Sequence, residues 1–370
     1  MLHKIFVAAI GMLSFIVSNA QIAAVINPSD SVATNSEEAK KEPTLTISGS
    51  MDAYYKNDFA NTKANSFTSF TQTHNSFSLG MASVKLEQKG GKVGAVADLG
   101  FGPRAKDFSY NDNGITQAIK QLYISYSPAD WLKFTLGTWA THVGYELLDP
   151  QLNRNYSMSY MFTNGPFSHT GMKAEITKGK HGVMIGLSNA TDYRTPPDGK
   201  INKKFLLAQY TFAPSDKVKF YLNYVNGQNP DTSKVNQFDA VITAKISDKF
   251  NIGYNGTISS TRAWDSKKKI NVESQSWWGN ALYLNFDPQP WFGLTLRTEY
   301  FSDKNNLKIT VNPNGCNIFA TTLSANFKSG GFTFIPEFRL DNSNKETFIN
   351  KSGGGNKAAG NFLFAAIYSF

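Results

Sequence analysis

The chain has 370 residues and a formal net charge of +9, from 37 Lys and Arg against 28 Asp and Glu. The basic residues are scattered, which argues against a nucleic-acid partner. Aromatic residues make up 14% of the chain although its mean hydropathy is −0.33. This combination is unusual for a soluble enzyme and typical of a barrel that is apolar outside and wet inside. The single cysteine, Cys316, excludes an intramolecular disulfide.

The first twenty residues have the pattern of a secretory signal peptide. Lys4 precedes an apolar run over 5–17, and Ser18-Asn19-Ala20 offers small residues for cleavage before Gln21. The alternative, a membrane-anchoring helix, needs roughly 20 apolar residues, and this run is shorter. We therefore predict a signal peptide over 1–20 and export to the outer membrane of a Gram-negative cell. Residues 21–43 are polar and predict a flexible periplasmic leader without a plug domain, which argues against an energised transporter.

From Thr44 onward, apolar and polar residues alternate with a period of two, as expected for β-strands with one apolar face. The clearest alternating stretches are 44–55, 217–224, 237–246 and 292–300. Two stretches are ambiguous: 75–88 switches face near Ser83, and 203–212 contains the apolar pair Leu206-Leu207. Elsewhere the outward face is almost entirely apolar, which favours a membrane barrel over a soluble sandwich.

Short and long connections alternate along the chain. Gly, Pro, Asp and Ser mark seven short turns, the residues that tight turns favour. Eight longer polar loops fall near 57–74, 103–114, 140–168, 190–202, 227–235, 261–275, 302–317 and 341–359. We therefore predict an all-β fold over 44–370: a transmembrane antiparallel β-barrel of about sixteen strands, with fourteen or eighteen as alternatives. The short turns would be periplasmic and the long loops extracellular.

A barrel of this size leaves an aqueous interior. The polar strand faces predict a mixed-charge lumen lined by Asp52, Asp98, Lys219, Asp239, Lys245, Arg297 and Glu299. The last strand ends with Tyr368 and Phe370 on its apolar face, and a terminal aromatic of this type is a candidate signal for the barrel assembly machinery. Outer-membrane lipid would cover the outside, and the sequence leaves open whether the chain forms a homotrimer.

The loop over 140–168 is the longest and the richest in functional groups. It holds candidate pore-constriction residues, namely His142, Glu146, Asp149, Arg154 and, at its end, His169. Such a loop could fold into the lumen or stay on the surface, and the sequence does not separate these alternatives.

The segment around this loop resembles the OmpL-like β-barrel porin family. The similar features are Leu136-Gly137 and Thr141, Gly144-Tyr145-Glu146, Asn155-Tyr156-Ser157, Gly165-Pro166-Phe167 and His169-Thr170-Gly171, together with "ISGSMDAYYKNDF" over 47–59. The resemblance extends from about Leu45 to Phe370, and it implies a passive outer-membrane channel without specifying a substrate.

We therefore expect a porin for passive diffusion of small hydrophilic solutes or ions, with no cofactor and no enzyme activity. A solute-selective channel is the main alternative, either for anions or for saccharides stacked on Trp139 or Trp277. An enzyme using His142, Glu146 and His169 is a distant alternative, because neither HExxH nor GxSxG is present and the spacing matches no standard zinc site. A receptor or adhesin would act through loops 261–275 and 341–359.

Overall fold

The computed structural model describes residues 44–196, 203–265, 267–268, 270–311 and 313–370. The predicted signal peptide over 1–20 and leader over 21–43 lie outside these residues. Within the described ranges, no helix is long and apolar enough to cross a membrane.

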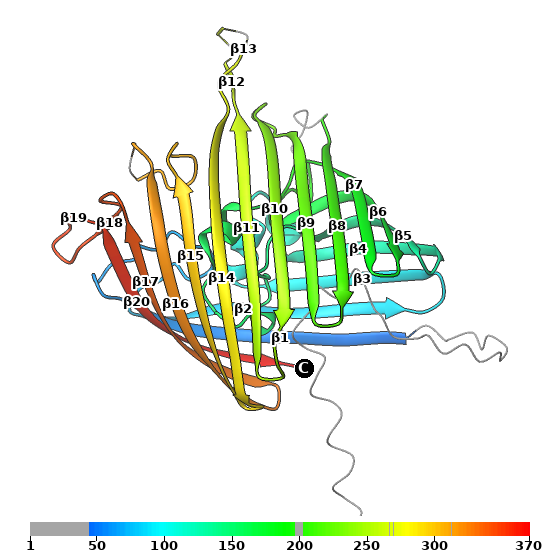
Figure 1. The fold of residues 1–370 in the computed structure, drawn as a ribbon, viewed down its shortest axis with the longest axis horizontal. Coiled ribbons are helices and arrows are strands. Elements are labelled where there is room, and N and C mark those ends of the chain that lie inside the picture. Colours follow the sequence, from blue (N-terminus) through cyan, green and yellow to red (C-terminus); the bar gives the residue numbers. More distant parts are fainter. Residues whose placement is uncertain (1–43, 197–202, 266, 269, 312) are drawn as a thin grey trace, which may run out of the picture.

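Sixteen antiparallel strands form one closed barrel, which confirms the predicted fold class and strand number (Figure 1). Each strand pairs with its neighbour in the chain, and the last strand pairs with the first, where Ser369 lies opposite Ser50. The strands are β1 (Thr44–Asp58), β2 (Ser76–Lys89), β3 (Val93–Phe101), β4 (Ile119–Ala129), β5 (Leu132–Ala140), β6 (Ser168–Lys178), β7 (His181–Ser188), β8 (Phe205–Ser215), β9 (Val218–Gln228), β10 (Lys234–Lys245), β11 (Phe250–Arg262), β14 (Gln275–Gln289), β15 (Phe292–Asp303), β16 (Cys316–Ser329), β17 (Phe332–Ser343) and β20 (Ala358–Ser369).

The remaining elements all lie in the longer connections. They are α1 (Pro103–Phe108), α2 (Tyr160–Asn164), the 3₁₀ turns η2 (Gly114–Ala118) and η3 (Pro150–Leu152), and two small hairpins, β12 (Trp264–Asp265) with β13 (Ile270–Asn271) and β18 (Phe348–Ile349) with β19 (Gly355–Asn356). The β12–β13 hairpin projects beyond the strands that carry it (Figure 1). The long connections are extracellular and the short turns periplasmic, as predicted.

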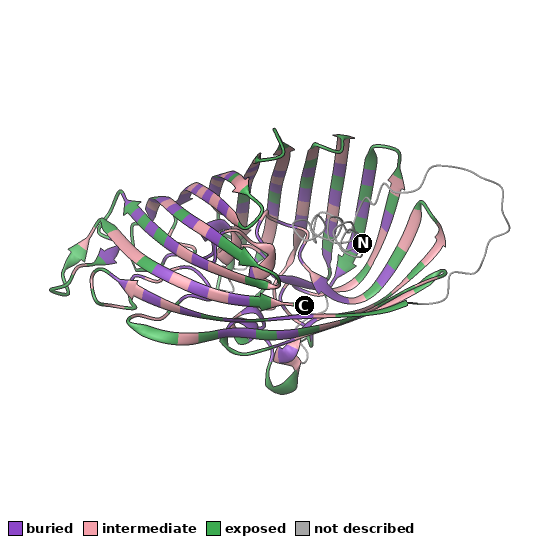
Figure 2. Ribbon diagram, turned by 90° about the horizontal axis from the view of Figure 1, so that it is seen from below, coloured by how far each residue is buried: buried purple, intermediate pink, exposed green. Residues whose placement is uncertain are grey.

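Buried and exposed residues alternate along the strands (Figure 2). In β1, for example, Met51 is 52% exposed and the next residue, Asp52, is 7% exposed. The exposed face is apolar because it contacts lipid, while the polar face turns to the interior, where side chains can pair with one another.

The face of β2 switches at a β-bulge, earlier than the sequence predicts. Met51 pairs with Ala82 but Ala53 pairs with Leu79, so Gly80 and Met81 together oppose one residue of β1. Both bulge residues are buried, and the strand changes phase there rather than near Ser83.

The ambiguous pair in β8 divides between the two faces. Leu206 is exposed on the outside, whereas Leu207 is buried in the interior with Trp139 and Phe205. The lumen wall therefore includes an apolar patch beside β5, which strict alternation of polar and apolar residues does not predict.

The barrel closes where β1 meets the end of β20. Gly49 and Phe370 exchange two backbone hydrogen bonds of 3.0 Å each. A Cβ atom at Gly49 would lie 2.7 Å from Cζ of Phe370 and 2.5 Å from the Ser83 carbonyl oxygen, so the terminal ring lies directly over this glycine. The role of Phe370 and Tyr368 as an assembly signal remains a prediction.

Substituting Gly49 should weaken the closure of the barrel. We expect Gly49→Val to lower the free energy of unfolding by about 1–3 kcal/mol, because the added atoms have no room. The measurement is urea unfolding of the refolded protein in lipid vesicles. Ala53→Val, on the exposed outer face of the same strand, is the control and should have little effect. Equal losses in the two variants would contradict a specific role for the Gly49–Phe370 contact.

Candidate functional site

The connection between β5 and β6, residues 141–167, lies inside the barrel. Its backbone and side chains bond to inward-facing residues of strands far apart in the wall. The Gly144 amide donates to Asp239 of β10 at 3.1 Å, and the Tyr156 hydroxyl donates to Asp52 of β1. Arg154 forms two hydrogen bonds with Asp287, near the periplasmic end of β14, at 2.8 and 2.5 Å. We call residues 141–167 the inner loop.

A buried ion pair joins the inner loop to β15. Arg297 is 0% exposed, and its Nη1 donates to Oε1 of Glu146 and, at 2.7 Å, to the carbonyl oxygen of Ser157. The second carboxylate oxygen of Glu146 accepts from the Ser159 amide at 2.8 Å. The pair therefore holds two separate parts of the loop against one side chain of the wall.

Two further wall carboxylates bind backbone amides of the loop. Glu299 accepts from the amides of Tyr160 and Met161 at 2.9 Å each, at the start of α2. Glu337 accepts from the Tyr156 amide at 2.8 Å. A loop inside a barrel has no ladder partners for its amides, and these carboxylates provide charge-assisted acceptors for them.

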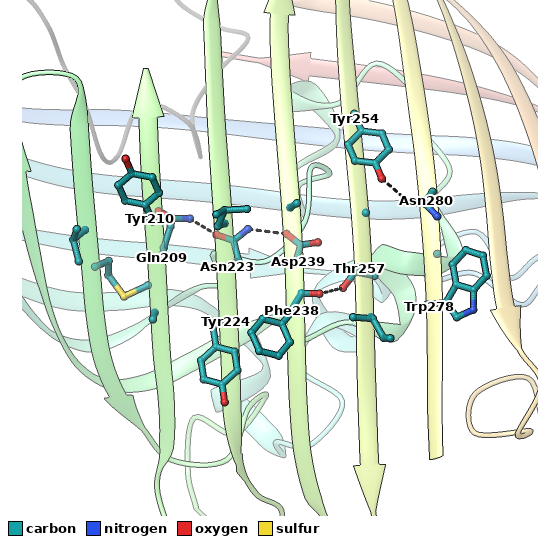
Figure 3. A pocket seen from close by; sticks show the side chains of 18 of the residues that line it. Gln209, Tyr210, Asn223, Tyr224, Phe238, Asp239, Tyr254, Thr257, Trp278 and Asn280 are labelled. Atoms are coloured by element: carbon teal, nitrogen blue, oxygen red, sulfur yellow. Dashed lines mark hydrogen bonds between the residues drawn. The ribbon is translucent and has the colours of Figure 1, made fainter. Parts of the chain in front are cut away.

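A chain of amide and carboxylate side chains holds the beginning of the loop. Gln209 donates to Asn223 at 2.8 Å, and Asn223 donates to Asp239 at 2.7 Å (Figure 3). Asn255 donates to the other oxygen of Asp239 at 2.6 Å. The carboxylate that accepts the Gly144 amide hydrogen bond is therefore itself fixed by a row of side-chain hydrogen bonds across β8, β9, β10 and β11.

Tyr145 of the loop packs into a hollow of the wall. Its ring stacks on Tyr283 with a centroid distance of 4.1 Å. A Cβ atom at Gly253 would lie 2.5 Å from Cε2 of Tyr145, so only glycine leaves room for the ring at this position.

Asp149 and Asp98 share one lysine. Nζ of Lys120 lies 2.9 Å from Oδ1 of Asp98 and also bonds to Asp149 of the loop. Lys120 occupies a bulge of β4, because Asp98 pairs with Gln121 and Leu99 pairs with Ile119. This irregularity explains why alternation did not reveal Lys120 as a lumen residue.

Three further charged residues that contact the inner loop were not predicted from the sequence. Arg104 of α1 donates to the Leu148 carbonyl at 3.0 Å and lies between the rings of Phe70 and Tyr156, 4.9 and 4.7 Å from their centroids. No pattern in its loop indicates this contact. Glu337 and Arg339, by contrast, alternate with outward-facing residues of β17, so the sequence did contain a signal for them.

His142 and His169 lie side by side with ring centroids 5.2 Å apart. Nε2 of His169 contacts Oγ1 of Thr141 at 3.1 Å, and Nε2 of His142 bonds to the Tyr224 carbonyl at 3.3 Å. Burial lowers the pKa of His142 to about 4, so its imidazole is neutral at physiological pH. Glu146 is bonded to Arg297 and supplies no carboxylate partner to these rings.

Metal-ligating side chains do not cluster in the described part of the chain: no three His, Cys, Asp or Glu residues there form a group that could hold an ion.

The other predicted lumen residues divide into two sets. Asp52, Asp98, Asp239, Arg297 and Glu299 are buried against the inner loop or its supports. Lys219 and Lys245 lie instead at the periplasmic ends of β9 and β10, where Lys245 pairs with the exposed Asp248 at 2.8 Å.

The tryptophans proposed as sugar platforms, Trp139 and Trp277, are both buried. Trp277 packs on Phe301 and Trp139 lies beside Lys173, so neither ring presents an open face. A groove of about 750 Å³ lies elsewhere, over the outer wall from β7 to β14. Its aromatic lining, drawn in Figure 3, belongs to the lipid-facing side: Tyr210, Tyr224, Phe238, Tyr254 and Trp278.

The fold is shared with solved outer-membrane channels. OmpT of Vibrio cholerae, described in a trimer form, is 11% identical over 89% of this chain and 99% of its own, with a TM-score of 0.59. The channel DcaP of Acinetobacter baumannii is 12% identical over 92% and 100%, with a TM-score of 0.60. An anion-selective porin from Comamonas acidovorans is 9% identical over 89% and 100%, with a TM-score of 0.57. No curated protein sequence matches this chain significantly.

A closed sixteen-stranded barrel with polar residues inside and apolar residues outside defines the class of outer-membrane porins. Residues 44–370 match the model of the family described as "Putative beta-barrel porin-2, OmpL-like", and the chain belongs to that family. This confirms the resemblance that the sequence suggested.

Removing Glu146 should destabilise the protein strongly. We expect Glu146→Leu to lower the free energy of unfolding by about 3–5 kcal/mol, because Arg297 would stay buried without its counter-ion. The measurement is urea unfolding followed by tryptophan fluorescence. Combining Glu146→Leu with Arg297→Leu should recover much of the loss. Glu87→Leu, which removes the partly exposed partner of Lys85 and Lys89, is the control, with an expected change within about 1 kcal/mol. Equal losses at Glu146 and Glu87 would show that the buried pair does not hold the loop.

Proposed function

We propose that this porin is a passive diffusion channel for small hydrophilic solutes or ions, and that the inner loop is its constriction. The docking of the loop on inward-facing charges from β1, β10, β14 and β15 supports this proposal. A sixteen-stranded barrel encloses an interior wide enough for water, and a loop fixed across it reduces the free cross-section.

We expect the charged groups of the inner loop and the wall to select which solutes pass. Asp149 and Arg154 are partly exposed, whereas Glu146 and His169 are buried and, together with the half-buried His142, act by holding the loop in place. Selection of saccharides by aromatic stacking has less support, because Trp139 and Trp277 are covered. We retain export through a cleaved signal peptide, residues 1–20, as part of the proposal.

We further propose a homotrimer. OmpT, which has the same fold, is described in a trimer form. In this chain the outer face of β2–β5 is lined by exposed aliphatic residues, including Leu86, Leu122 and Leu136, around the small residues Ala95 and Ala97. Small side chains allow another wall to approach closely within a membrane.

Loosening the inner loop should increase conductance. We expect Gly253→Val to displace Tyr145 and widen the lumen, giving larger single-channel steps than the wild-type protein in planar bilayers. Ile252→Val, at a neighbouring lipid-facing position, is the matched control and should conduct like wild type. A complete absence of steps from the wild-type protein would refute the channel, and unchanged steps in Gly253→Val would refute the constriction.

The same recordings test the oligomeric state. A trimer that inserts as a unit should open and close in three equal levels, because each barrel conducts independently. Chemical cross-linking of the protein in vesicles should yield a band at three times the monomer mass. Isolated single levels together with an uncross-linked monomer would contradict the homotrimer.

A further inference from the structure

Several lysines line the inner wall in the part of the barrel toward the short turns. Lys133 is the second residue of β5 and Lys219 the second residue of β9, so both lie beside periplasmic turns. Lys85 lies on β2 between the outward-facing Val84 and Leu86, opposite Asp98 of β3. We call this region the lower vestibule, lined by Lys85, Lys133, Lys173, Lys219 and Lys245.

The carboxylates of the lower vestibule do not balance these charges. Glu175 is shared by Lys133 at 2.9 Å and Lys173 at 3.3 Å. Glu87 is likewise shared by Lys85 at 3.0 Å and Lys89 at 2.9 Å. The first group therefore keeps one net positive charge, whereas Lys85 also lies opposite Asp98 across the ladder. The ammonium groups remain accessible, since the side chain of Lys133 is 37% and that of Lys85 34% exposed.

Lys219 adds a charge without a counter-ion. In the described part of the chain, no carboxylate forms an ion pair with it. Its ladder partner Thr243 is uncharged, as are Ala213 and Pro214 at the irregularity of β8 on its other side. Among the described residues, the one ion-pair partner of Lys245 is Asp248, which lies in the exposed turn.

The layer of the inner loop has the opposite character. Three of its cations are ion-paired: Arg297 with Glu146, Arg339 with Asp341, and Lys120 with both Asp98 and Asp149. Arg104 instead donates to backbone carbonyls of the loop. Further carboxylates, those of Asp239, Glu299 and Glu337, have amide donors instead of cations. The lumen thus changes along its axis from a compensated, acid-rich layer to a basic lower vestibule.

We propose that the lower vestibule attracts anions, so that the channel conducts small anions, including multivalent ones such as phosphate or dicarboxylates, in preference to cations. Fixed charges on a water-filled wall with low-dielectric surroundings concentrate counter-ions and set ion preference. The vestibule lies on one side of the constriction, so the current should also depend on the direction of the voltage. The proposal rests on the proposed channel function.

The test is the reversal potential of single channels between unequal KCl solutions. The wild-type protein should favour chloride, more strongly at low salt, because screening weakens with falling ionic strength. Lys133→Glu and Lys219→Glu each change the charge by two units. At ~10 Å in water, such a change corresponds to about a fourfold change in the local anion concentration, and the chloride-to-potassium permeability ratio should fall accordingly.

The controls separate this proposal from folding and from the channel itself. Lys268→Glu makes the same charge change at the 74% exposed tip of the extracellular hairpin and should leave the ratio unchanged. Lys219→Gln changes the charge by one unit, so it should shift the logarithm of the permeability ratio by half as much as Lys219→Glu. This milder variant keeps the test valid if the glutamate variant does not fold. Potassium phosphate in place of KCl should still support current. A potassium preference of the wild-type protein, or a permeability ratio that Lys133→Glu and Lys219→Glu leave unchanged, would refute the anion-attracting vestibule but not the channel. An absence of single-channel steps would refute both.

Discussion

The Arg297 guanidinium lies in the wall of the barrel, fully buried, and its counter-ion comes from a loop that starts on β5. A charge in that position is very costly unless it is paired and its remaining donors are bonded. Glu146 and the Ser157 carbonyl meet that requirement only if the loop enters the lumen. The pair therefore makes the inner loop a part of the folded structure, and the constriction that we propose depends on it.

The wall is adapted to the loop at several other places. Glu299 and Glu337 accept hydrogen bonds from loop amides that would otherwise lack partners. Asn223 and Asn255 fix the orientation of Asp239. Gly253 leaves room for the ring of Tyr145. These contacts spread over strands on different sides of the barrel. Loop and wall consequently stabilise each other, and the loop also links strands that share no backbone hydrogen bonds.

This arrangement uses the charges of the interior for two purposes. In the layer of the inner loop they are ion-paired or hydrogen-bonded to backbone and amide groups, because burial makes an isolated charge unfavourable. Toward the periplasm the wall is wetter, and lysines such as Lys133 can remain in excess because water solvates them. In the channel that we propose, the first part provides a fixed narrow section and the second an approach whose field favours one sign of ion.

The amino-acid sequence by itself determined the strands, their number and the two faces, because alternation and turn residues are local signals that survive without knowledge of the partners. It also determined which loop carries charge. Only the tertiary structure decided that this loop turns inward, since that depends on Arg297, Glu299 and Glu337 lying opposite it after the barrel closes. The bulge at Lys120 and the contact of Arg104 were equally beyond the sequence, whereas the change of face in β2 was visible in it and only its position, at Gly80 and Met81, came from the structure. Register and closure bring together residues far apart in the chain, and no periodicity within a strand records which of them will meet.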